Sequence, residues 1–435
     1  MSENAGSTTA PRADGALGIA AQRALRGLCE RGRDAWLAGE PLARERDRAD
    51  GLGADDGPAA GRALPSALAL TDASPQEVLE HFPRGVPIAT APGVVVAVAL
   101  SGETGRDRPL GTLDVHCGVA LGPDALARAA FTAHAVALDA ATGRAIDPFG
   151  GERDRRARVL RCAGDARAAL AASPCAALRA LRLVGEDGYA ADEALEKALA
   201  EAAPRFSLAQ RAHGRGELAR MLTGRFAGRA LALAERTGLA ARIAPTRPGA
   251  AAWIDALPRA LEPRLAAWLE GDAAAWLRDW RFGIERSQRV LDWIAHHPLE
   301  RAVDPRRDAQ VARLERRLGS DGLAVAFALR RAELASGVVP EANAARARAA
   351  LGALEAALAR VAAARARTAQ RRALALSGEE VMEALGCGPG RRVGEALRHL
   401  GAFTAADPSR NTPERLRAEL AAWDAASARA ADGRR

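Results

Sequence analysis

Helical periodicity from Arg161 to the C-terminus constrains the fold of this chain more than any other feature. Apolar residues recur there three or four positions apart, and the clearest runs span 176–184, 192–201, 216–222 and 228–236. Residues 341–373 add one long stretch dominated by alanine and arginine. This spacing is that of a single apolar helix face, and alanine is the strongest helix former. An all-helical region from residue 161 onward is therefore expected.

Strand signals lie mainly between residues 19 and 160. Residues 94–100 form a β-branched run that follows Pro92-Gly93, which is typical of a buried strand. Residues 133–139 and Ala145-Ile146 flank a turn at Gly143 and predict a hairpin. The expected fold class is therefore α+β, with a small mixed-sheet head followed by helices.

Composition excludes several classes of protein. The sequence contains no charge-free apolar run of about 18 residues, so no membrane span is expected. Residues 1–18 predict a disordered tail rather than a signal peptide. The five cysteines are scattered without a CxxC pair, so neither a disulfide framework nor a zinc site is expected, and a reducing cytoplasm fits. The net charge of +8 is carried almost entirely by arginine and permits a polyanionic partner.

Tryptophan is concentrated in one segment, since five of the seven lie between residues 251 and 300. They could stack on nucleic-acid bases, or they could fill the core of a helical domain whose other side chains are small. The four-residue spacing of Trp276 and Trp280 follows the helical period and favours the core.

Three stretches of the sequence, taken in order, carry the motifs of a known family. The matching residues are Gly61-Arg62, Thr71–Val78 and Phe82-Pro83, then Phe131–Asp139, Asp147–Asp154 and Leu178–Arg182, and finally Leu376–Met382 with Gly388–Gly390. Their order and spacing resemble the tRNA nucleotidyltransferase/poly(A) polymerase family, and in particular the class II CCA-adding enzymes. The resemblance covers residues 20–425.

The resemblance implies an architecture in four parts after the N-terminal tail. A polymerase-beta-like nucleotidyltransferase head at 19–157 would be followed by an RNA-binding-like helical neck at 158–244, a helical body at 245–372 and a helical tail at 373–435. Some relatives carry a phosphohydrolase domain whose metals are held by a His-Asp dipeptide. This chain has no such dipeptide, so a body without hydrolase activity is expected.

The family's reaction needs two divalent metal ions held by carboxylates. The resemblance implies a DxD pair at the end of a head strand and a third acidic residue in an RRD element. In this chain the pair falls on Ser66 and Leu68, and the third position falls on Ala130. These side chains cannot ligate magnesium as carboxylates do, so no metal site and no catalysis are expected from them.

The nucleotide-binding motifs depart from the family in the same way. The Gly-Gly turn that grips the triphosphate in the family falls on Gly39 and Glu40. The EDxxR element that selects CTP and ATP falls on Ala172, Ser173 and Ala176. Residual nucleotide contacts are expected only from Arg128, Arg179 and Arg182.

A basic stretch follows the Asp-Pro-Phe-Gly-Gly motif. Arginine suits phosphate binding because it is always charged and donates bidentate hydrogen bonds. A solvated helix face explains the stretch equally well. If it binds RNA, the residues expected to do so are Arg153, Arg155, Arg156, Arg158 and Arg161.

Several other polar residues favour structural roles. Asp55-Asp56 predicts a solvated turn rather than a displaced metal site. His296-His297 is typical of a helix end, and His213 of a salt bridge in the neck. His134 replaces an asparagine of the family motif and is expected to make a polar contact in the head core.

These observations predict a degenerate, catalytically inactive member of the family, a cytoplasmic pseudoenzyme that binds RNA or protein. One alternative is an active CCA-adding or poly(A)-adding enzyme that uses Mg²⁺ and displaced metal ligands. Another is a structural partner of an active paralogue. No cofactor is expected unless the first alternative holds; the expected partners are tRNA or another RNA, and there is no signal for membranes or DNA.

Overall fold

The computed structural model of the protein describes seven segments of the chain: 13–50, 66–90, 93–101, 110–172, 175–206, 209–372 and 374–432. They form two compact units, one of residues 1–299 with 321–346 and one of residues 300–320 with 347–435. In the described segments no single helix has the length and apolar composition of a membrane span, although the bent pair 166–172 and 176–187 does when taken together.

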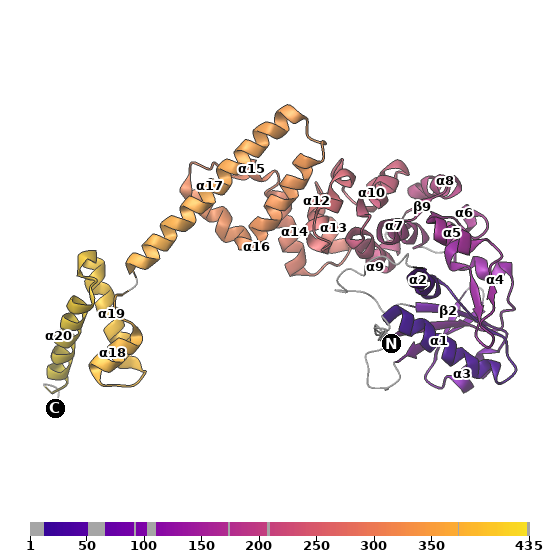
Figure 1. The fold of residues 1–435 in the computed structure, drawn as a ribbon, viewed down its shortest axis with the longest axis horizontal. Helices are drawn as coiled ribbons and strands as arrows, with labels where there is room; N and C mark the ends of the chain where they lie inside the picture. Colours follow the sequence, from indigo (N-terminus) through magenta and orange to yellow (C-terminus); the bar gives the residue numbers. More distant parts are fainter. Residues whose placement is uncertain are drawn as a thin grey trace, which may run out of the picture. The chain divides into compact units, whose positions relative to one another are not determined.

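One seven-stranded mixed sheet forms the centre of the head (Figure 1). Its strands are β1 (Ala35–Ala38), β2 (Ser66–Thr71), β3 (Val86–Thr90), β4 (Gly93–Leu100), β5 (Gly111–His116), β6 (Ala137–Asp139) and β7 (Ala145–Ile146). Their order is β3-β4-β5-β2-β1-β6-β7, and only β2 and β5 run parallel. The predicted strand at 94–100 and the predicted hairpin are confirmed as β4 and as β6-β7, with Gly143 at a φ of +72°.

Helices cover the head sheet. They are α1 (Ala13–Cys29), α2 (Glu40–Ala49), α3 (Pro75–His81), α4 (Pro123–Ala127), the 3-10 turn η1 (Thr132–His134) and α5 (Gly151–Ala157). Leu17 and Leu25 of α1 are fully buried in a core with Val78 of α3 and Val96 of β4. The prediction of a disordered tail up to residue 18 is therefore wrong for residues 13–18, because this end of α1 anchors an apolar face in that core; the preceding residues lie outside the described segments.

The neck is helical apart from one short parallel pair of strands. Its elements are β8 (Val159–Leu160), α6 (Ala166–Ala172), α7 (Ala176–Asp187), β9 (Ala190–Ala191), α8 (Glu193–Ala202), η2 (Ala203–Arg205), α9 (Ala209–Thr223), α10 (Ala227–Arg236) and α11 (Leu239–Ile243). The four predicted helices are confirmed as α7, α8, α9 and α10. Helix α7 packs against both α9 and α10 (Figure 1).

The tryptophan-rich segment is the core of the body, as predicted. The elements of the body are η3 (Ala250–Ala252), η4 (Ile254–Ala256), α12 (Leu261–Trp268), α13 (Ala273–Asp279), α14 (Ile284–Ala295), α15 (Leu299–Ala302), α16 (Asp308–Ala335) and α17 (Glu341–Arg372). All five tryptophans are at most 7% exposed. Trp276 lies 5.1 Å from Trp280 between ring centroids and donates from Nε1 to the carbonyl of Ile243 at 2.7 Å, so these rings pack inward.

The tail forms a small helical core of its own. Its helices are α18 (Gly378–Leu385), α19 (Arg391–Ala406), η5 (Pro408–Arg410) and α20 (Pro413–Asp432). Ser377 and Glu380 form a capping box that starts α18. Leu400 and Leu416 are fully buried between α19 and α20. Boundaries between the two compact units fall inside α16 and α17 and do not match the predicted boundaries at 157, 244 and 372. The four-part division therefore stays a prediction.

Candidate functional site

Leu68, at the predicted metal position, lies in the middle of β2 and packs into an apolar cluster. In the sheet it pairs with Ala38 of β1 on one side and with Asp114 of β5 on the other. Leu68 is half-buried, and like Trp36, Phe149 and Ala129 it packs against the edge of a buried cluster that contains Leu70; Ala129 is the central residue of the predicted RRD element. Ser66 begins the same strand, opposite Thr112. The environment of Leu68 is thus that of a packing residue.

Ala130, at the third metal position, has an unusual backbone. It is 7% exposed and adopts a φ of +66°, in the left-handed region. Outside glycine, this region is populated mainly by asparagine and aspartate, whose short polar side chains bond locally, while alanine is strained there. The backbone at this position therefore keeps a conformation that suits an acidic residue better than the alanine present.

The Asp-Pro-Phe-Gly-Gly motif is held by hydrogen bonds within the head. Asp147 accepts from the backbone N–H of Gly151 at 2.6 Å and of Glu152 at 3.0 Å, so it caps α5. The hydroxyl of Thr132 donates to Asp154 Oδ2 at 2.8 Å, and both side chains are buried. A Cβ on Gly151 would lie 2.0 Å from the carbonyl oxygen of Thr132, so only glycine fits there. These motif residues position α5 against η1.

Glu40, in the predicted Gly-Gly turn, is the first residue of α2 and points into a cluster of arginines. Arg182 of α7 donates to both Glu40 oxygens, at 2.9 and 2.5 Å. Arg44 and Arg220 each donate to Oε1 at 2.9 Å. Gly39, at a φ of +94°, precedes it and donates its N–H to the carbonyl of His134 at 3.0 Å. We call Glu40, Arg44, Arg182 and Arg220 the Glu40 cage.

Three more carboxylates surround the Glu40 cage from the neck. Arg182 also pairs with Glu186 at 3.0 Å and with Glu217, and its side chain is completely buried. Glu186 and Asp187 both accept from Arg44, at 2.8 and 3.2 Å. Although burial opposes the charge of Glu40, the cage arginines hold its pKa well below the usual value. Burial and the adjacent Glu186 raise the pKa of Asp187 to about 6.

His134, predicted to make a polar contact in the head core, borders the same cluster. It is 5% exposed, and burial, against the opposing effect of Glu40 and together with the charges of Arg182, Arg179 and Arg44, lowers its pKa to about 4. The imidazole is therefore neutral at pH 7.

The pH dependence of stability should report this buried imidazole. Its folded pKa of about 4 lies below the ordinary 6.5, so between these values the unfolded chain binds the proton and acid destabilises the fold. Asp187, with its raised pKa, opposes the trend below pH 6 in wild type and variant alike. Urea unfolding should show that His134→Gln loses about 2–3 kcal/mol less stability than wild type between pH 7 and 4.5. A difference that is constant with pH would contradict this expectation.

Of the remaining predicted nucleotide-binding residues, only Arg179 borders the Glu40 cage among those that the structure describes. Ala172 is exposed at the end of α6, and Ala176 is fully buried at the start of α7. Arg128 is exposed just after α4, and Arg179 pairs with Glu217 at 3.5 Å. Ser173, Asp55-Asp56 and the side chains of Ser66 and His213 lie outside what the structure describes.

The predicted RNA-binding arginines divide by exposure. Arg153, Arg156 and Arg161 are 71%, 64% and 42% exposed in their side chains. Arg158 is 22% exposed and pairs with Asp47 at 2.7 Å. Arg155 is 1% exposed and is surrounded by carboxylates, so the prediction that it faces RNA is wrong: its charge is neutralised inside the head.

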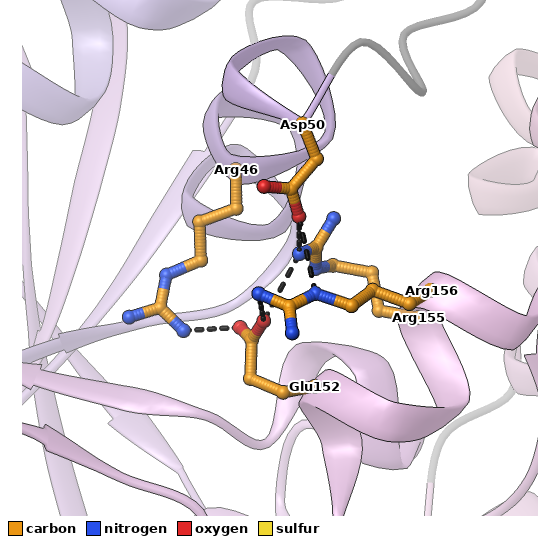
Figure 2. Close-up of a pocket in the computed structure, with 5 residues that line it drawn as sticks. All are labelled: Arg46, Asp50, Glu152, Arg155 and Arg156. Carbon is orange, nitrogen blue, oxygen red and sulfur yellow. Dashed lines mark hydrogen bonds and ion pairs between the residues drawn. The ribbon is translucent and has the colours of Figure 1, made fainter.

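A pocket of about 290 Å³ opens between α2 and α5 (Figure 2). Arg46 of α2 and Asp50, the residue after that helix, line it on one side, and Glu152, Arg155 and Arg156 line it from α5. Glu152 pairs with Arg46 and, at 3.0 Å, with Arg155, while Asp50 pairs with Arg155 and, at 3.3 Å, with Arg156. Both carboxylates are thus shared among the guanidinium groups, so the pocket walls are themselves a salt-bridge network.

The histidine pair of the body is explained by structural contacts. His296 Nδ1 lies 2.6 Å from the carbonyl of Asp292 at the end of α14, as expected of a helix-end residue. His297 contacts Glu333 at 2.8 Å, and Glu333 also accepts from Arg330 at 2.6 Å. In the described segments no group of three or more His, Cys, Asp or Glu side chains is arranged to hold a metal ion.

Sequence reasoning missed two features of the site. The Glu40 cage joins residues 142 and 180 positions apart, and the local signal for it is the i,i+4 pair of Glu40 with Arg44. Asp114 lies beside Leu68 because β2 and β5 run parallel, and the pattern of β5 does not reveal that pairing.

Known proteins similar to this chain include CCA-adding enzymes. No family model matches the chain. The CCA-adding enzyme of Geobacillus sp. (strain WCH70) is 34% identical over 178 residues, which cover 39% of this chain and 44% of the relative. That of Geobacillus thermodenitrificans (strain NG80-2) is 30% identical over 240 residues, covering 53% and 58%. The chain thus spans about half the length of the curated relatives it matches.

The fold match extends over almost the whole chain. The Bacillus stearothermophilus CCA-adding enzyme in complex with CTP aligns over 94% of this chain and 98% of its own, with a TM-score of 0.52 and 24% identity. The Thermotoga maritima enzyme complexed with tRNA aligns over 93% and 95%, with a TM-score of 0.56 and 15% identity. The resemblance seen in the motifs is confirmed: over about half its length the chain is similar in sequence to CCA-adding enzymes, and its fold matches theirs.

Proposed function

We propose that this chain binds RNA, with tRNA as the first candidate, and does not add nucleotides to it. The observation that carries the proposal is the position of Leu68. It stands on the central strand β2, where the motif match expects a metal-binding carboxylate, and it packs in an apolar cluster instead. Ala130 supports the same conclusion, because its backbone has a conformation that suits aspartate while its side chain is a methyl group.

Loss of the metal carboxylates removes the chemistry and leaves the scaffold. Two-metal catalysis stabilises the attacking and leaving oxygens by several kcal/mol, and each 1.36 kcal/mol corresponds to a factor of ten in rate. In contrast, the Asp147 cap and the Thr132–Asp154 hydrogen bond serve the fold and are intact. A protein that keeps only these parts can still fold and offer a surface that binds RNA.

RNA binding is supported by the relatives and by the exposed arginines. A homologous fold has been solved with tRNA, in the Thermotoga maritima enzyme. Arg153, Arg156 and Arg161 lie near the predicted head-neck boundary, and their side chains are exposed although each also pairs with at least one carboxylate. Binding through arginine and phosphate is backbone-dominated, so its affinity should fall as salt rises.

Two assays test the proposal. Purified protein is incubated with Mg²⁺, CTP, ATP and tRNA that lacks its 3′ CCA. Its rate of nucleotide incorporation should be lower than that of an active CCA-adding enzyme by a factor of at least about 10³. The same tRNA should bind with an affinity that falls with salt. Replacing Arg153, Arg156 and Arg161 together by glutamine should weaken binding, whereas the matched change at Arg286 and Arg289 of α14, which are 44% and 54% exposed, should not. Absence of salt-dependent tRNA binding would favour a protein partner, such as an active paralogue.

A second candidate function is nucleotide addition with displaced metal ligands, and Asp114 is the observation that favours it. This half-buried carboxylate lies directly beside Leu68 in the sheet. If magnesium-dependent incorporation is robust and Asp114→Asn abolishes it while Asp124→Asn, an exposed change in α4, does not, the active alternative is correct.

A further inference from the structure

Three guanidinium groups converge on one carboxylate in the Glu40 cage. Arg182 grips both oxygens of Glu40, while Arg44 and Arg220 add a further donor each to Oε1 at 2.9 Å. The carboxylate thus accepts at least four charge-assisted hydrogen bonds. This is a high number for one surface-reaching glutamate, and it is the donor density that oxyanions with several acceptor oxygens attract.

The cage is assembled from three helices and reaches solvent on one side. Glu40 and Arg44 come from α2 of the head, Arg182 from α7 and Arg220 from α9 of the neck. The Arg182 side chain is completely buried, whereas Glu40 and Arg220 are 22% and 28% exposed. An anion arriving from solvent would meet Glu40 and Arg220 first.

The charge balance of the cluster depends on Glu40. With Arg179, which pairs with Glu217, the cluster has four arginines against four carboxylates: Glu40, Glu186, Asp187 and Glu217. Without the Glu40 charge, four guanidinium groups would face three carboxylates. The positive surplus would lie at the solvent-reaching end of a donor set that already has the geometry for an oxyanion.

We propose that Glu40 is a built-in anion that fills a three-arginine polyphosphate site, so that the wild-type protein excludes polyphosphate from it. The carboxylate supplies the negative charge and acceptor oxygens that a phosphate group would otherwise supply. Removal of that charge opens the site to a ligand of the inorganic triphosphate class.

This inference deepens the proposed function and rests on it in one respect. Nucleotide addition requires a bound triphosphate, so a chain that excludes triphosphate from this site is one that does not add nucleotides. The two can fail separately. The experiment for Glu40 contains neither metal ion nor RNA, whereas the proposed function is decided by incorporation and by tRNA binding.

Calorimetry with inorganic triphosphate at low salt, without metal, tests the inference on the full chain. Wild type should give no binding. Glu40→Gly, which removes the side chain, and Glu40→Gln, which removes only its charge, should each bind at one site at least about tenfold more tightly than wild type, with an affinity that falls as salt rises. Adding Arg220→Met to Glu40→Gly should abolish the gain. Glu196→Gln removes the carboxylate that pairs with Arg236 at 2.8 Å on the surface and should bind no better than wild type.

The second variant guards against loss of folding. Glu40→Gln keeps the volume of the side chain, so it serves if Glu40→Gly unfolds. The inference is overturned if wild type binds triphosphate as tightly as either variant, or if a folded Glu40 variant shows no gain. It is equally overturned if Arg220→Met leaves the gain intact.

Discussion

Replacement of Arg182 by methionine is expected to lower the free energy of unfolding by about 3–5 kcal/mol. The guanidinium is completely buried and donates to Glu40, Glu186 and Glu217. Methionine fills a similar volume but leaves these carboxylates facing one another with less compensation. Breaking a buried ion pair by removing one partner is more harmful than replacing the whole pair, because the remaining charges stay desolvated.

A matched surface pair provides the control for this prediction. Arg236→Met removes the partner of Glu196, whose ion pair spans 2.8 Å with side chains 58% and 36% exposed. Such exposed pairs contribute about 0–1 kcal/mol to the free energy of unfolding. Urea unfolding followed by circular dichroism measures both variants. If Arg182→Met and Arg236→Met lose equal stability, the Glu40 cage does not hold head and neck together.

The helical part of the fold could be predicted because its signals are local. Apolar spacing within 176–184 and 228–236 determines which face of α7 and α10 is buried, and no distant residue is needed. The same holds for the tryptophans of the body, whose helical spacing indicated a core. Helix α1 shows the limit: its first turns look like a polar tail in sequence, and only contact with the head sheet buries Leu17.

The site could be predicted in part, since motif matching found the positions and the fold determines their partners. Leu68, Phe149 and Trp36 come from distant parts of the chain, and the fold brings all three against the same buried cluster. The burial of Arg155 could not be predicted, because two of its counter-charges, Asp47 and Asp50, lie more than a hundred residues earlier in the chain. Arginine that faces RNA and arginine that neutralises a buried carboxylate look alike in sequence.

Gly151→Ala is expected to destabilise the head by about 3 kcal/mol or more. The added Cβ would lie 2.0 Å from the carbonyl oxygen of Thr132 and 2.9 Å from Val136. The first of these is a backbone atom, so the clash cannot be relieved by rotating a side chain and α5 must move away from η1. That movement would strain the buried hydrogen bond from Thr132 to Asp154.

An exposed glycine in the same compact unit should respond in the opposite direction. Gly216 lies in α9 with no atom within 4 Å of a Cβ placed on it, so Gly216→Ala should stabilise the helix by about 0.5–1 kcal/mol. Urea titrations of both variants under identical conditions give the comparison. If both variants lose similar amounts of stability, close packing does not require glycine at position 151. Opposite signs would show that the Asp-Pro-Phe-Gly-Gly segment is retained because the fold requires it, whether or not any chemistry remains at Leu68 and Ala130.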